Sequence, residues 1–171
     1  MLYTPSWTDI LQDAQEVLQE LDRFVITNNT TQDVRADHLG FKCSTTAEFE
    51  AMRTLLEGRS AFLYQSIISQ RRIAICRLTI PLQSACGPIE YIELSDQKPD
   101  LSQLRGFDHV EVYPSDGNVP RIVAALEARG IAIASSHRPH HMTFDTRLTE
   151  QFMLRIEQEP LITKIKNTEM H

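Results

Sequence analysis

The spacing of hydrophobic residues changes several times along the chain, and each change marks a predicted element. Residues 6–25 predict an amphipathic helix, because their apolar side chains recur at the three- and four-residue intervals of one helix face. Ser6 and Asp9 are placed like a capping box at its start. Such a helix must bury its apolar stripe, either on the rest of the chain or on a second subunit.

From residue 37 the pattern becomes alternating. The apolar residues at positions 39, 41 and 43 alternate with polar or small ones, as in a strand with one face on a core, which puts His38 on the opposite face. Residues 45–58 predict a helix that begins with a second capping box and ends at Gly58. Three extended runs follow, over residues 61–68, 72–82 and 88–94.

The same order recurs from residue 107. Val110 and Val112 alternate with polar residues and again place the histidine, His109, off the apolar face. A helix over residues 119–130 and a run of extended segments follow, over residues 131–136, 141–148, 152–158 and 161–166. Both halves open with Asp-His, and the two histidines are 71 residues apart. This repetition predicts an internal duplication.

The expected fold class is α+β, with two tandem βαβββ modules that form a curved mixed sheet around a cavity. We expect an N-terminal amphipathic helix in residues 1–30, a first module in 31–105 and a second in 106–171, together one compact domain. The modules could pair within one chain or across a homodimer interface, and the sequence leaves this open.

Composition narrows the classes of partner. The chain has 171 residues, 42% hydrophobic and 23% charged, with a net charge of -6 and scattered basic residues, so it offers no footprint for nucleic acid. No apolar run approaches the ~20 residues that cross a bilayer, and the start of the chain does not resemble a secretion signal. Cys43, Cys76 and Cys86 are odd in number, which favours buried free thiols and a reducing, cytoplasmic location.

The candidate chemistry lies on the strand faces that point away from the apolar core. His38, His109 and Glu93 all occupy such positions and would face the cavity. Two imidazoles and a carboxylate suit a divalent metal such as Zn, Ni, Mn or Fe. The alternative for a single strand histidine is a hydrogen-bonded structural role.

Three stretches, DHLGFKC (37–43), RRIAICRLTIPLQSACGPIEYIEL (71–94) and GFDHVEV (106–112), together resemble the YecM-like branch of the vicinal oxygen chelate superfamily. That superfamily includes glyoxalase I, extradiol dioxygenases and bleomycin-resistance proteins. The resemblance spans about residues 36–113. It implies metal ligands on the first and last strand of each module, and His38, Glu93 and His109 match three of the four positions.

The fourth metal ligand is the open point. Counting from His109 as Glu93 is counted from His38 leads to Lys164, which repels a cation, and Glu169 follows five residues later. A rival source is the stretch HRPHH, of which His141 begins a predicted strand; His137 and His140 fit a polar loop better.

The resemblance implies an enzyme of isomerase, lyase or dioxygenase type that chelates adjacent oxygens of a small molecule, with Glu93 as the candidate base. Lys42, Arg77 and Glu111 are candidates for binding the substrate. For Arg77, an ion pair with Glu90 or Glu111 is an equally good interpretation. The alternative function is a metal-free small-molecule-binding protein of the same fold.

Overall fold

The computed structural model describes residues 5–137 and 141–169. Its elements, in chain order, are α1 (Trp7–Thr27), β1 (Val34–Lys42), α2 (Thr46–Glu57), β2 (Ser60–Ile68), β3 (Arg71–Ser84), β4 (Gly87–Ser95), β5 (Gly106–Pro114), α3 (Val119–Glu127), β6 (Ala134–His137), β7 (Met142–Arg147), β8 (Met153–Ile156) and α4 (Leu161–Glu169). The predicted α+β class is confirmed.

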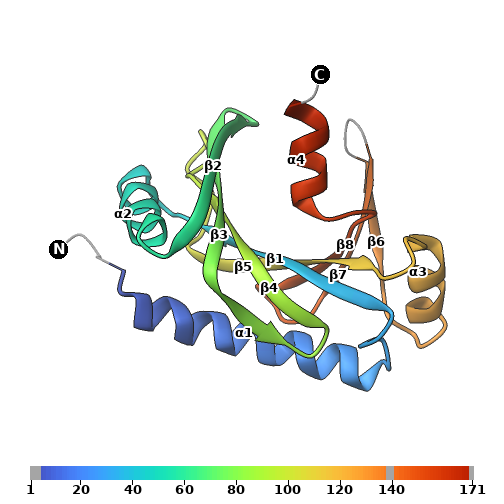
Figure 1. Cartoon of the computed structure of the whole chain (residues 1–171). Coiled ribbons are helices and arrows are strands. Elements are labelled where there is room, and N and C mark those ends of the chain that lie inside the picture. Colours follow the sequence, from blue (N-terminus) through green and yellow to red (C-terminus); the bar gives the residue numbers. More distant parts are fainter. Residues whose placement is uncertain (1–4, 138–140, 170–171) are drawn as a thin grey trace.

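The strands of the described residues form one eight-stranded mixed sheet in the order β2-β3-β4-β1-β5-β8-β7-β6. β1 pairs in parallel with β4, and β5 pairs in parallel with β8, while all other neighbours are antiparallel. Each half therefore repeats the order strand, helix, three strands. The two halves meet where β1 runs antiparallel to β5, at the centre of the curved sheet (Figure 1).

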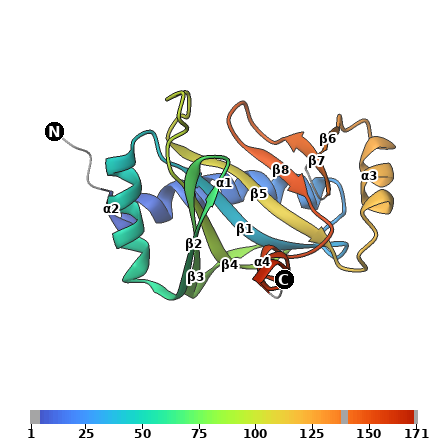
Figure 2. The same ribbon diagram turned by 90° about the horizontal axis from the view of Figure 1, so that it is seen from above.

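The main hydrophobic core lies on one face of this sheet. α1 runs along that face (Figures 1 and 2), and its buried stripe includes Ile10, Leu18 and Val25. Leu39 and Phe41 of β1 are completely buried in the same core. The stripe of α1 is thus buried on the chain's own sheet. No helix of the described ranges has both the length and the apolar character needed to span a membrane.

The three cysteines behave as the sequence predicts. Cys43, Cys76 and Cys86 are all buried and free. They lie in the main core among apolar side chains and act there as small hydrophobic residues.

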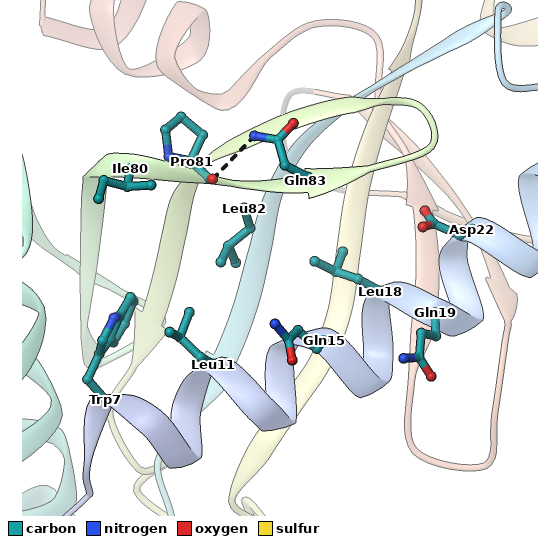
Figure 3. A pocket seen from close by; sticks show the side chains of 10 residues that line it. All are labelled: Trp7, Leu11, Gln15, Leu18, Gln19, Asp22, Ile80, Pro81, Leu82 and Gln83. Atoms are coloured by element: carbon teal, nitrogen blue, oxygen red, sulfur yellow. Dashed lines mark hydrogen bonds between the residues drawn. The ribbon is translucent and has the colours of Figure 1, made fainter.

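A cavity of about 470 Å³ separates α1 from β3 on the core side of the sheet (Figure 3). Trp7 and Leu18 of α1 face Leu82 across it, at the place where the pairing of β3 with β4 is interrupted. Asp22 is the only charged side chain among the ten described residues of its lining, and its carboxylate accepts a hydrogen bond from the backbone of Ala85 (2.7 Å). The cavity lies between packed elements, and its described lining contains no cluster of titratable side chains.

The register between β1 and β5 shifts twice, and the extra residue is an aspartate each time: Asp37 in β1 and Asp108 in β5. In both strands the ladder resumes at the next residue, His38 or His109. These are β-bulges, which bend a strand and redirect the side chains beside it. They explain why the residues of β1 that lie in the hydrophobic core have even numbers before residue 37 (Val34, Ala36) and odd numbers after it (Leu39, Phe41).

The prediction of a final strand over residues 161–166 is wrong, because this segment begins α4. Its apolar residues Leu161, Ile162 and Ile165 follow helical rather than alternating spacing. They pack on the face of the sheet opposite α1, against Ile73 and Ile75. α4 therefore stands over the concave side (Figure 1), which we call the cup.

Candidate metal centre in the cup

Three side chains singled out from the sequence meet in the cup. His38 on β1, Glu93 on β4 and His109 on β5 offer ligand atoms that all lie within 4.8 Å of one another. Nε2 of His38 is 3.9 Å from Oε2 of Glu93, and the imidazole rings are nearly perpendicular with centroids 5.7 Å apart. The three side chains come from three adjacent strands of the sheet.

The two histidines each leave one nitrogen without a partner. The His38 side chain is fully buried and that of His109 is 3% exposed. Neither Nε2 atom has a hydrogen-bond partner within the described part of the chain. A buried polar atom without a partner costs free energy. Two such nitrogens beside one carboxylate therefore fit a metal ion that accepts their lone pairs.

The repeated Asp-His pair orients both rings. Nδ1 of His38 is 2.8 Å from Oδ2 of Asp37, and Nδ1 of His109 is 2.6 Å from Oδ1 of Asp108. Each bulge places the aspartate where it contacts the ring of the next residue. A carboxylate on Nδ1 fixes the tautomer in which Nε2 is free to bind a metal. The repeated Asp-His pair thus supplies, in each half, a candidate metal ligand together with the carboxylate that orients it.

Gly40 makes room for His109. The two residues are partners across β1 and β5, and the imidazole lies over the glycine. A Cβ atom built on Gly40 would stand 2.0 Å from Cε1 of His109 and 2.7 Å from its Nε2. Any side chain at position 40 would thus displace the ring from its place beside Glu93.

Carboxylates dominate the electrostatics of the cup. Burial by itself would lower the pKa of His38, but Glu111, Asp37 and Glu93 outweigh it and raise this pKa to about 9. Burial would raise the pKa of Glu93, yet the imidazoles and Lys42 hold it below its usual value. The protein without a metal thus takes up a proton at the place where a cation fits.

Glu111, a candidate for substrate binding in the sequence, lies beside the two histidines. Its Oε1 is 3.7 Å from Nε2 of His38 and 3.9 Å from Nε2 of His109. Its Oε2 is buried and has no hydrogen-bond partner among the residues described. Glu111 therefore contacts both histidines, and with Asp37 and His38 it forms a second group of side chains whose ligand atoms lie within 4.8 Å of one another.

The position in the second half that corresponds to Glu93 in the first half, and where the fourth ligand was expected, holds Arg155. Glu93 stands two residues beyond the β4 partner of His38, and Arg155 stands two residues beyond the β8 partner of His109. Arg155 donates to both oxygens of Asp145 (2.8 and 3.3 Å) and lies 3.8 Å from Glu111. A guanidinium thus occupies the place of a carboxylate.

The other candidates for this position lie elsewhere. Lys164 and Glu169 belong to α4 rather than to a strand, and the side chain of Glu169 is outside the described residues, as is His140. His141 is 3.4 Å from Glu157, a residue that Lys164 also contacts at 2.8 Å. His141 does not belong to the groups of described side chains that could hold a metal together.

Of the two basic candidates for substrate binding, Lys42 lies next to the cluster and Arg77 does not. Nζ of Lys42 lies 3.8 Å from Glu93 and 3.7 Å from Asp108, so Lys42 stands next to the cluster. Arg77 forms an ion pair with Glu90 at 3.4 Å, where the two side chains are 49% and 40% exposed. The structure does not bring Arg77 to the cluster.

Sequence reasoning missed the bulges, Gly40 and Arg155. The bulges had a signal, because core positions change parity between residues 36 and 39 and again between residues 107 and 110. Arg155 would have emerged if the predicted strand over residues 152–158 had been compared with residues 88–94. Gly40 had no signal, because a glycine in a strand does not reveal which ring lies over it.

Comparison with known proteins gives a consistent result. The model of the family described as YecM protein matches residues 6–159. Protein YecM of Escherichia coli (strain K12) is 25% identical over 139 residues, which are 76% of this chain and 70% of that protein. The solved structure of the structural-genomics protein EC4020 has a TM-score of 0.67 at 21% identity and covers 98% of both chains.

A more distant solved structure shares the fold. The hydroxyglutarate synthase from Oryza sativa, in complex with 2-oxoadipate, has a TM-score of 0.50 at 8% identity. The match covers 94% of this chain and 84% of that one.

Proposed function

The chain belongs to the YecM protein family and has the vicinal oxygen chelate fold, and from this premise we propose that it is a divalent-metal-dependent enzyme. His38, Glu93 and His109 would hold the metal, which can be Zn, Ni, Mn or Fe. The substrate would be a small molecule that presents two adjacent oxygens. The reaction class is isomerase, lyase or dioxygenase.

One observation carries the proposal: the buried Nε2 atoms of His38 and His109 have no hydrogen-bond partner among the described residues and lie beside the carboxylate of Glu93. The Nδ1 atom of each ring contacts the aspartate that precedes it. A structural histidine uses its ring nitrogens for hydrogen bonds to protein groups. Here Nδ1 of each ring does so and Nε2 does not, which is the arrangement of a metal-binding imidazole. Glu111 supports the proposal because it places a second carboxylate within 4 Å of both Nε2 atoms and could serve as the fourth ligand in place of the carboxylate that Arg155 replaces.

A divalent metal in this place would act as a Lewis acid that stabilises negative charge developing on a substrate oxygen. The chain's own residues supply the rest. Glu93 reaches both the cluster and the cavity beside it, so its carboxylate can take a proton from a bound molecule. Lys42, 13% exposed and 3.8 Å from Glu93, can stabilise an anionic oxygen on the same side.

Metal analysis tests the proposal. The purified protein, after reconstitution with each candidate ion, should hold about one ion per chain, measured by elemental analysis after gel filtration. His109→Ala should lose the ion. His141→Ala is the matched control, because this histidine lies outside the cluster and its variant should retain the ion. Retention of the metal by His109→Ala would refute the assignment.

A metal-free binding protein of the same fold is the competing function, and Arg155 favours it. A guanidinium at the fourth ligand position, 3.8 Å from Glu111, offers a positive charge without a metal. In that case no candidate ion should remain bound to the wild-type protein after reconstitution.

A further inference from the structure

A second cavity lies in the cup, directly beside the candidate metal centre. We call it the side pocket; it has a volume of about 270 Å³ and is lined mainly by apolar side chains. Tyr64, Ile73 and Ile75 come from β2 and β3, and Leu161 and Ile165 come from α4. Ile73 and Ile75 are 5% and 4% exposed whereas Ile68 is 54% exposed, so the pocket is buried on the side of β3 and open to water at the end of β2.

Glu93 connects the side pocket to the metal centre. It is both a member of the cluster with the two histidines and part of the wall of the pocket. The register across the sheet explains this, because Glu93 pairs with Ile75 and Ile75 pairs with Tyr64. A molecule held at the cluster therefore has hydrocarbon next to it on one side.

The corresponding positions of the other half hold an ion pair in place of apolar side chains. Arg155 pairs with Asp145 across β8 and β7, and the two side chains are joined by an ion pair. An apolar group placed there would have to break that pair, which is unfavourable in a partly buried site. An apolar group can therefore extend from the cluster in one direction, toward β2 and β3.

We propose that the substrate is amphipathic: two adjacent oxygens bind at the cluster and a compact apolar group fills the side pocket. A volume of about 270 Å³ equals about nine water molecules at ~30 Å³ each, and a packed methylene group takes about the same space, so about nine carbon atoms fit it. The binding of the two oxygens at the cluster rests on the proposed function. The binding of the apolar group rests on the side pocket.

Straight-chain hydroxamic acids test the two ends separately, because they chelate metals through adjacent oxygens and differ only in their tails. Calorimetric titration of the metal-loaded protein should show acetohydroxamic acid binding weakly. Each further methylene should tighten binding about fourfold up to about nine carbons. Equal affinities along the series would overturn the inference and leave the metal centre intact.

Two variants on β2 locate the effect. Ser66 lines the pocket, so Ser66→Phe should fill it and abolish the gain with chain length while acetohydroxamic acid still binds. Gln65→Phe is the matched control, because Gln65 is exposed and its side chain points to the other face of the strand. A gain that survives in Ser66→Phe contradicts the assignment.

A metal-independent measurement keeps the inference testable if acetohydroxamic acid fails to bind, which would refute the proposed function. 1-Hexanol added to the metal-free protein should shift the methyl NMR signals of Ile75 and Ile165, and Ser66→Phe should abolish the shifts. Shifts of this kind support the side pocket by themselves. Their absence overturns it.

Discussion

Corresponding positions in the two halves of the cup hold side chains of opposite character. Outward from His109, across β1, β4, β3 and β2, the paired residues are Gly40, Glu93, Ile75 and Tyr64. Outward from His38, across β5, β8, β7 and β6, they are Glu111, Arg155, Asp145 and Ala134. The first row leaves space beside a carboxylate and ends in hydrocarbon, whereas the second contains a run of charged side chains.

The difference shows what a duplicated framework retains. Both rows have the same register from strand to strand, so the backbone geometry of the two halves is preserved. The chemistry is not, because one half keeps a candidate metal ligand and the other has replaced it with an ion pair. Only the first half is therefore suited to both a metal ion and an apolar ligand, and the following predictions test this division.

The largest effect is expected for Gly40→Ala in the first row. The new methyl group would displace the His109 ring, and metal affinity should fall by more than about 100-fold, beyond the usual effect of losing an outer partner. Competition with a chelator measures this. Gly58→Ala is the control, because Gly58 has negative φ and the nearest atom to its added Cβ is 3.8 Å away. Unchanged affinity in Gly40→Ala would contradict the placement of the ring.

Paired substitutions at Glu93 and Arg155 should give opposite results. Glu93→Gln should lower metal affinity by at least about tenfold and lower the free energy of unfolding less than the change at Arg155 does. Arg155→Met should lower the free energy of unfolding by about 3 kcal/mol, because it leaves Asp145 and Glu111 without their cation. Denaturant titration and metal titration of both variants decide. Equal stability losses would mean that the two rows do not differ in role.

The pH dependence of the metal-free protein should reflect His38. Its pKa of about 9 in the folded protein lies above the ordinary 6.5, so the stabilisation is complete below pH 6.5 and is lost as the pH rises through about 9. The loss should reach up to about 3 kcal/mol in urea titrations. His38→Gln should flatten this profile. A wild-type profile as flat as that of the variant would contradict the raised pKa.

The smallest expected effects are those of substitutions at Asp37 and Asp108, and one of these effects should differ between the two aspartates. Asp37→Asn and Asp108→Asn should each lower metal affinity about tenfold, because each removes a carboxylate from Nδ1 of a histidine. Asp37 also accepts a hydrogen bond from the backbone of Leu161 (2.9 Å), at the start of α4. Only its variant should therefore speed amide hydrogen exchange in residues 161–166. Equal exchange in both variants would exclude this second role.

Much of the fold was predictable because it depends on local periodicity. The alternation around His38 and His109 identified the faces of β1 and β5, and the capping residue Ser6 marked the start of α1. α4 was misassigned because the sequence alone does not show that β8 already has β5 and β7 as partners, which leaves no place for another strand.

The candidate site was predictable only in part, and for a physical reason. Face periodicity places His38, Glu93 and His109 toward the cup, but the contact of Gly40 with His109 depends on the register between strands. The exchange of a carboxylate for Arg155 likewise becomes visible only when β5 and β8 are aligned. Counting residues along the chain failed because the helix and the last three strands of the second half are shorter than those of the first half.

The two bulges make the length of β1 and β5 as important as their composition. Removing Asp37 altogether, rather than replacing it, would restore plain alternation, so that one of the two ends of β1 must turn its side chains to the other face. Either His38 would then point beneath α1, or the first residues of the strand would leave the core. The seam between the halves can thus accept many substitutions during evolution, but a single-codon deletion there would remove an imidazole from the cup without changing any histidine.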